Sequence, residues 1–143
     1  MDIVHNLKIS TTPSALYELF TTEAGINKWW SLDCELAQKP GDISRLRFTK
    51  GEDKIEMGFR LDEWIPHQKV VWTCVENANP AWINTTLHFL IQEAHDAVDF
   101  TFQHQNWDEK WKGQLPYEQT KHGWEHFMKS LKDSCEKGVG EPW

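Results

Sequence analysis

Residues 117–137 read YEQTKHGWEHFMKSLKDSCEK, and their pattern is the most informative in the chain about its architecture. Its apolar side chains recur at helical spacing and share one stripe, which consists of Trp124, Phe127, Met128, Leu131 and Cys135. Charged side chains lie on the opposite side, at Lys121, Glu125, Lys129, Lys132 and Asp133. A helix of about 21 residues is roughly 30 Å long, which is enough to cross a whole sheet. The sequence therefore predicts one long amphipathic helix whose apolar stripe is buried against other elements.

The region before this helix, from about Glu35 to His104, alternates apolar and polar residues with the period of two that is typical of strands. Turn-forming residues interrupt the alternation at 39–42, 50–53, 65–67 and 77–80. Within three of the strands, the residues that share one face are Ile55, Met57, Phe59 and Leu61, then Ile83, Leu87, Phe89 and Ile91, then Val98, Phe100, Phe102 and His104. We expect consecutive antiparallel strands that each bury one side.

The first thirty residues contain one more strand and two short helices. Alternation from Ile3 onward predicts a strand that runs to about Ser10, and the following stretch Thr11-Thr12-Pro13-Ser14, with hydroxyl groups and a proline in the first turn, is a typical start for a helix. The pair Thr21-Thr22, followed by Glu23, forms a second cap that begins a short helix leading to Trp29 and Trp30. The order is strand, two short helices, about six strands and one long helix, which predicts an α+β fold.

We expect a single domain over residues 1–143. Its long helix would lie on the concave face of a curved antiparallel sheet. Because a curved sheet touches a straight helix at few points, the space between them is expected to be an elongated apolar cavity.

The composition narrows the range of partners. The chain carries 15 Lys and Arg against 22 Asp and Glu, so its formal net charge is −7, and binding to nucleic acid or to an anionic membrane is not expected. Cys34, Cys74 and Cys135 are widely separated and form no metal or redox motif. The amino terminus lacks signal-peptide features, and no apolar run reaches the roughly 20 residues of a membrane span. We predict a cytoplasmic protein with reduced thiols and no cofactor.

Several stretches of the sequence resemble one known family. Residues 12–22 read TPSALYELFTT and residues 26–30 read INKWW, which is similar to the helix-one signature of the ATPase-activator-homologue family in the START-like SRPBCC superfamily. Further similar stretches are EWIP at 63–66, VVWT at 70–73, FTFQH at 100–104 before Trp107, and GW at 123–124 with Phe127 and Leu131. The resemblance covers nearly the whole chain and implies the helix-grip fold, in which about six to seven antiparallel strands wrap a long carboxyl-terminal helix.

The resemblance implies little about chemistry. The family is named after a co-chaperone that activates the ninety-kilodalton heat-shock-protein ATPase. The signature residues are similar to packing residues, and likeness of fold does not by itself establish an activity.

We expect the cavity to bind a small hydrophobic or amphipathic molecule. Trp29, Trp30 and Trp107 are predicted to lie near its mouth, where indole rings would hold a flat or apolar ligand. The predicted walls are Met57, Phe59, Leu87, Phe89, Phe100, Phe102, Trp124, Phe127, Met128 and Leu131. His104 and Thr85 could orient the ligand through hydrogen bonds.

Two pairs of histidines raise the question of catalysis or metal binding. His5 and His104 are inward-facing titratable groups, which suits a general base and equally suits a core histidine with hydrogen-bond partners. His122 and His126 are four residues apart on the helix, but no third ligand is evident, and a solvated helix face explains them better. Gly123 costs about 1 kcal/mol in a helix interior, which suggests close approach of the backbone to the sheet or the pocket. We predict no catalytic residue and no metal ligand.

Three functions remain open. The leading hypothesis is a binding protein for a small hydrophobic molecule rather than an enzyme. The second is a cavity enzyme that transfers protons, as in cyclisation or dehydration, with His104 or His5 as the base. The third is an interaction module that modulates a chaperone or another protein through a sheet edge, and such edges could also support a homodimer.

Overall fold

The computed structural model describes residues 1–143, apart from the side chain of Lys50. The strands are β1 (Ile3–Ile9), β2 (Asp33–Glu35), β3 (Ile43–Lys50), β4 (Asp53–Ile65), β5 (Lys69–Asn77), β6 (Thr86–Ala94) and β7 (Ala97–Gln105). The helices are α1 (Pro13–Glu18), α2 (Glu23–Trp29) and α3 (Leu115–Lys137), with short 3-10 turns η1 (Pro80–Trp82) and η2 (Glu109–Trp111). None of the described helices is both long and apolar enough to span a membrane.

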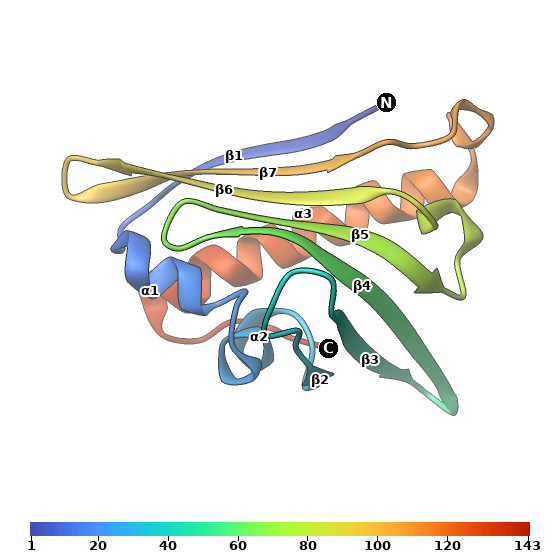
Figure 1. Ribbon diagram of the computed structural model, residues 1–143, viewed down its shortest axis with the longest axis horizontal. Helices are drawn as coiled ribbons and strands as arrows, with labels where there is room; N and C mark the ends of the chain where they lie inside the picture. Colours follow the sequence, from blue (N-terminus) through green and yellow to red (C-terminus); the bar gives the residue numbers. More distant parts are fainter.

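All seven strands belong to one antiparallel sheet in the order β1-β7-β6-β5-β4-β3-β2. The strands from β2 to β7 form a meander, and β1 joins its far edge by pairing Ile3 with His104 and Ile9 with Val98. Figure 1 shows α3 running along the length of the sheet on one side of it, with α1 and α2 at one end. The two layers are therefore the sheet and α3.

β4 is the longest strand, with 13 residues. Its register against β5 shifts between Gly58 and Phe59 and again between Leu61 and Glu63. Such bulges bend a strand and increase its twist. The hairpin of β3 and β4 therefore bends away from the plane of the other strands.

The two short helices begin at the predicted caps. Thr12 Oγ1 accepts from the backbone N–H of Ala15 at 3.1 Å, and Thr22 Oγ1 accepts from that of Gly25 at 2.9 Å. The corner between the helices is tight, because a Cβ atom on Gly25 would lie 2.0 Å from the carbonyl oxygen of Glu18. Only glycine fits at this position.

The core is built mainly from aromatic rings. Four residues of the stripe that the sequence predicts on α3 are buried: Trp124, Phe127, Met128 and Leu131 are each at most 7% exposed, while Cys135 at its end is partly exposed. The ring centroid of Trp124 lies 4.3 Å from that of Phe102 on β7 and 5.3 Å from that of Trp30. Through these contacts α3 packs against the sheet on one side and against the end of α2 on the other.

The predicted α+β class, the helix-grip architecture and the order of elements are confirmed. α3 begins at Leu115, slightly before the predicted start near Tyr117. The placement of Ile83 on a strand face is wrong. Because η1 occupies the preceding residues and β6 begins only at Thr86, Ile83 lies in the connection and is 37% exposed.

The segment after α3 folds back onto the start of the structure. The Ser130 hydroxyl on α3 donates to the carbonyl oxygen of Trp29 at 2.8 Å and accepts from the backbone N–H of Glu141 at 2.7 Å. The backbone N–H of Trp143 donates to the carbonyl oxygen of Trp30 at 3.0 Å. These bonds hold residues 138–143 against the end of α2.

Candidate functional site

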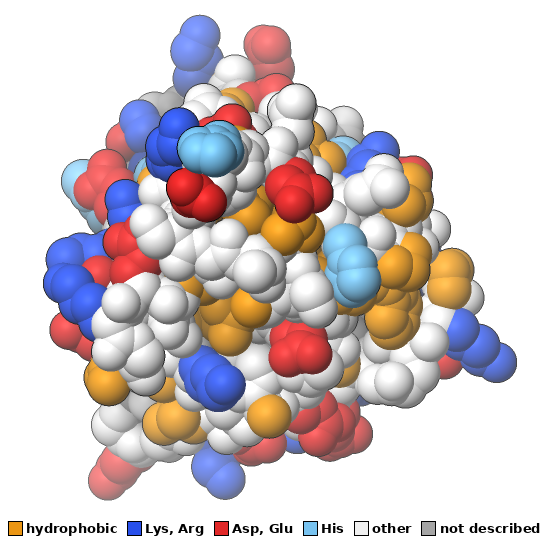
Figure 2. All heavy atoms as spheres, turned by 90° about the vertical axis from the view of Figure 1, so that its left-hand side faces the viewer, with side chains coloured by type: hydrophobic (Ala, Val, Ile, Leu, Met, Phe, Trp, Pro, Cys, Tyr) orange, Lys and Arg blue, Asp and Glu red, His pale blue; other side chains and the backbone are white. Residues whose placement is uncertain are grey.

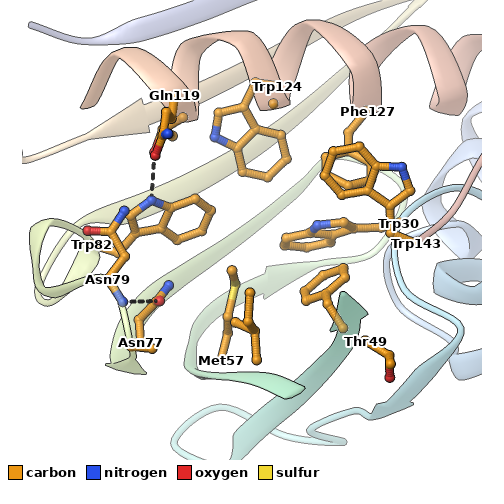
Figure 3. Close-up of a pocket in the computed structure, with 15 residues that line it drawn as sticks. Trp30, Thr49, Met57, Asn77, Asn79, Trp82, Gln119, Trp124, Phe127 and Trp143 are labelled. Atoms are coloured by element: carbon orange, nitrogen blue, oxygen red, sulfur yellow. Dashed lines mark hydrogen bonds between the residues drawn. The ribbon is translucent and has the colours of Figure 1, made fainter. Parts of the chain in front are cut away.

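A pocket lies between α3 and the part of the sheet formed by β3, β4 and the end of β5. Its volume is about 680 Å³, within the range of about 300–1,000 Å³ that is usual for small-molecule sites. Its wall consists of Trp30, Phe48, Thr49, Ile55, Met57, Asn77, Ala78, Asn79, Trp82, Gln119, Thr120, Gly123, Trp124, Phe127 and Trp143. Figure 3 shows the amide side chains of Asn77, Asn79 and Gln119 at one end, together with the ring of Trp82, and the rings of Trp30, Phe127 and Trp143 toward the other end.

Rigid aromatic rings form much of the wall. Trp30 caps the end of α2, and its ring centroid lies 6.5 Å from that of Phe127. Trp82, from η1, stacks on Trp124 with centroids 5.9 Å apart and planes inclined by 23°. These four side chains are at most 8% exposed, so core packing fixes their positions before any ligand arrives. The pocket is preformed.

The opposite end carries ordered polar groups. Asn77 Oδ1 accepts from the backbone N–H of Asn79 at 2.8 Å, and Asn79 Oδ1 accepts from that of Ala81 at 3.0 Å (Figure 3). Trp82 Nε1 donates to Thr120 Oγ1 at 2.8 Å. Among the atoms that the structure describes, the buried Nδ2 of Asn77 has no hydrogen-bond partner. This end therefore combines a fixed framework with a buried amide donor that has no partner among the described atoms.

Trp143 forms the edge of the pocket near α2. Its ring stacks on His126 with centroids 4.8 Å apart and meets Phe127 edge-on at 4.7 Å. His126 Nε2 donates to the carbonyl oxygen of Glu141 at 2.9 Å, which ties the same segment to α3. The Trp143 side chain is held in place although the residue is 55% exposed.

Gly123 leaves a bare stretch of helix in the wall. Close packing against the sheet does not require a glycine here, because a Cβ atom at this position would meet no described atom within 4 Å. The expectation of close backbone approach to the sheet or the pocket is therefore met on the pocket side, because Gly123 belongs to the pocket wall.

The wall offers no evident acid–base or metal chemistry. Within the described part of the chain, none of its residues has an ionisable side chain, and no group of three His, Cys, Asp or Glu residues could hold a metal. The three cysteines are free, and burial raises the pKa of Cys74 to about 12 and that of Cys34 and Cys135 to about 11. Their thiols stay protonated at neutral pH and are poor nucleophiles.

His104 belongs to a buried hydrogen-bond chain beside the pocket. Trp124 Nε1 donates to His104 Nδ1 at 3.0 Å, and an indole N–H can only donate, so the proton of the neutral imidazole sits on Nε2. Nε2 donates to Thr85 Oγ1 at 2.7 Å, and the Thr85 hydroxyl donates to the carbonyl oxygen of Trp82 at 2.5 Å. His104 is fully buried and lies outside the pocket wall.

Burial also determines the charge of this histidine. It holds the pKa of His104 well below the ordinary value, with a smaller contribution in the same direction from His88. Both ring nitrogens already have partners in the core. The geometry thus favours the core-histidine interpretation of His104 over that of a base acting on a ligand, and its predicted role with Thr85 in orienting a ligand stays a prediction.

The other three histidines that the sequence singles out, His5, His122 and His126, differ in their surroundings. His5 is half-buried near Phe102, and burial lowers its pKa while Glu125 on α3 opposes that shift. His122 lies on the exposed side of α3, and its Nδ1 atom is 3.8 Å from Oε2 of Glu125. His126 differs from the expected solvated histidine, because it packs on Trp143.

The structure brings four of the predicted ligand-binding residues together in the pocket wall, namely Trp30, Met57, Trp124 and Phe127. The others lie in the packed core outside the wall, and these are Trp29, Phe59, Thr85, Leu87, Phe89, Phe100, Phe102, His104, Trp107, Met128 and Leu131. Trp107 covers the other end of α3, where its ring meets that of Tyr117 at 5.0 Å and its N–H donates to the carbonyl oxygen of His104.

Sequence reasoning missed the amide end of the pocket and the rings of Trp82 and Trp143. The turn signal at residues 77–80 was the available clue, because Asn79 before Pro80 is a typical start of a short helix, and Trp82 follows directly. No periodic pattern extends beyond Gly138, so the sequence gives no clue to Trp143.

A curved antiparallel sheet that grips a long carboxyl-terminal helix over an apolar pocket defines the helix-grip class of START-like domains. Within that class, the family model described as "Activator of Hsp90 ATPase homolog 1-like protein" matches residues 10–136. The chain belongs to this family.

Solved structures agree with this assignment. The chain is similar to an Aha1 from Colwellia psychrerythraea, solved as a dimer, with 28% identity, a TM-score of 0.80 and coverage of 98% of this chain and 99% of that one. A protein from Staphylococcus saprophyticus shares the fold at 19% identity, with a TM-score of 0.78 and coverage of 99% and 96%. An AHSA1-like protein from Aeromonas hydrophila does so at 10% identity, with a TM-score of 0.76 and coverage of 96% and 94%. Comparison with curated proteins found no match.

Proposed function

We propose that this protein binds a small, mainly apolar molecule in the pocket between α3 and the β3–β5 part of the sheet. The observation that carries the proposal is the preformed cavity of about 680 Å³. A cavity of this size, walled by aromatic rings and ending in a few polar groups, suits a small organic ligand.

Binding fits the wall better than proton transfer does. An acid–base enzyme needs a titratable group within hydrogen-bond reach of the substrate. The described wall residues offer hydroxyl, amide and indole groups but no such group. His104, the base of the enzyme hypothesis, is enclosed in the core with both nitrogens paired.

The experiment is a thermal-shift screen of the purified protein against lipids, sterols, flavonoids and other apolar metabolites, with native mass spectrometry to detect a molecule carried from the host. A ligand at about 100 times its dissociation constant should add about 2.7 kcal/mol to the free energy of unfolding, which a melting curve resolves. A bare native mass together with no shift for any compound would refute the proposal.

A pair of variants on β4 places the binding site. Met57→Trp puts a large ring into the pocket wall, whereas Ile65→Trp makes a similar change at a residue of the same strand that is 39% exposed and outside the wall. We expect Met57→Trp to abolish the thermal shift and Ile65→Trp to leave it unchanged. Equal shifts in both variants would place the ligand elsewhere.

A dimer and a cytoplasmic location belong to the same proposal. The relative from Colwellia psychrerythraea was solved as a dimer, and β1 and β2 each have a neighbouring strand on one side only. The free thiols suit a reducing compartment. Light scattering at several protein concentrations tests the dimer, and a single monomeric mass throughout would contradict it.

On the face shown in Figure 2, apolar side chains occur in several small groups between charged and polar ones. Large continuous apolar patches are the usual mark of a protein-binding surface. This face therefore gives less support to the interaction-module hypothesis than the pocket gives to ligand binding.

A further inference from the structure

We infer that the pocket selects flat, uncharged ligands, which lie with one face on the bare backbone of α3 at Gly123. This inference rests on the proposed function and specifies its ligand class. It makes Gly123 a specificity-determining residue, although its position in the middle of a helix is unfavourable for glycine.

Gly123 is explained neither by backbone geometry nor by packing. The other glycines within or beside the helices have such reasons: a Cβ atom on Gly25 would lie 2.0 Å from a carbonyl oxygen, one on Gly140 would lie 2.5 Å from another, and Gly138 ends α3 with a φ of 78°. Apart from its two chain neighbours and the nearby backbone of α3 itself, a Cβ atom on Gly123 would meet no described atom within 4 Å. The space into which it would project is the pocket.

The rings around Gly123 favour a flat molecule. Trp82 and Trp124 are nearly parallel, and Trp30 lies 5.3 Å from Trp124 between centroids. Aromatic rings gain more from an offset-stacked or edge-on aromatic partner than area burial alone provides. Without a side chain at Gly123, such a partner can approach α3 to van der Waals distance.

The polar groups of the wall favour a neutral molecule. No described wall residue has an ionisable side chain, and moving an unpaired ion out of water is costly. The indole N–H groups of Trp82 and Trp124 already donate to Thr120 and His104. The remaining polar groups belong to the amide end. They can hydrogen-bond to a carbonyl or hydroxyl group of a ligand, but they cannot compensate for the desolvation of an ion.

The test uses prodan, an uncharged flat naphthyl ketone whose fluorescence reports an apolar site. Its affinity is compared with that of anilinonaphthalene sulfonate, which is aromatic but anionic, and with competition by dodecanol, which is uncharged but flexible. We expect wild-type protein to bind prodan at least about tenfold more tightly than either comparison compound.

Variants at Gly123 then separate the effect on binding from that on stability. Gly123→Ala should raise the melting temperature, because alanine favours helices and meets no clash, and should weaken prodan binding. Gly123→Leu should weaken it by about tenfold or more, since the side chain fills the space beside the rings. The matched controls His122→Ala and His122→Leu change the exposed neighbouring position and should leave affinity unchanged.

The outcomes distinguish this inference from the proposed function. Wild-type protein that binds prodan in the pocket, with equal affinity for the Gly123 variants, would overturn the inference and leave the proposed function standing. A preference for dodecanol or for the anion would do the same. Protein that binds none of these probes and no compound of the metabolite panel would overturn both.

Discussion

The buried chain through His104 makes a quantitative prediction about stability and pH. Burial keeps the pKa of His104 well below its ordinary value of 6.5, so the folded protein holds this histidine neutral while the unfolded chain takes up a proton below pH 6.5. The unfolded state then binds more protons, and stability falls as the pH falls. The loss is about 1.4 kcal/mol per pH unit for each histidine kept neutral.

His104→Gln isolates this contribution from those of the other histidines. At pH 7.5 the variant should be less stable than wild type by about 1–3 kcal/mol, because the N–H of Trp124 or the hydroxyl of Thr85 loses its partner. Between pH 7.5 and 5.0, wild type should lose about 2 kcal/mol more than the variant. His5 and His88 also have lowered pKa values, but they are present in both proteins and cancel.

The assay is urea unfolding of both proteins across this pH range, followed by tryptophan fluorescence and checked by circular dichroism. A difference in unfolding free energy that shrinks steadily below pH 6.5 is the expected result. A difference that stays constant would show that His104 takes up a proton in the folded protein. That result would refute the burial argument and return His104 to consideration as an acid or base.

Three further changes test the packing that positions the pocket. Gly25→Ala should lower the free energy of unfolding by more than about 3 kcal/mol, because its Cβ atom would overlap a carbonyl oxygen. A urea midpoint close to that of wild type would contradict the close approach at the corner between α1 and α2. Ser130→Ala should cost about 1–3 kcal/mol and speed amide hydrogen exchange at Glu141, since the hydroxyl joins that residue to Trp29; unchanged exchange would count against the tether. Tyr17→Phe should be neutral or stabilising by up to about 1 kcal/mol, because the buried hydroxyl has no partner among the described atoms; a clear loss in melting temperature would reveal a missing partner.

The fold could be predicted because its signals are local. The stripe on α3, the caps at Thr12 and Thr22 and the alternation along β7 each depend on a few neighbouring residues. The error at Ile83 has the same origin, since alternation continues past the point where η1 interrupts it. Hydropathy shows which residues prefer burial but not where a regular strand begins.

The pocket could be predicted only in part, because it depends on contacts between distant segments. Trp30, Met57, Trp124 and Phe127 were predicted because they lie on faces that the sequence marks as buried. The same criterion also selected residues such as Phe100, which fill the core. Whether a buried face meets another side chain or a cavity is decided by the bulges of β4 and the placement of η1.

The wall of the pocket contains two kinds of residue, which are those that also hold the core together and those that only face the pocket. Trp124 faces the pocket, packs on Phe102 and donates the hydrogen bond that fixes His104, so a change in its shape alters the core as well as the wall. Gly123 and Met57 face the pocket without a comparable bond. The effects of substitutions on stability add when the residues are independent and do not add when the residues share contacts. Substitutions at Gly123 and Met57 can therefore change ligand preference with little effect on the free energy of unfolding. The same helix can therefore keep the sheet closed through Trp124 while the neighbouring glycine sets what the pocket admits.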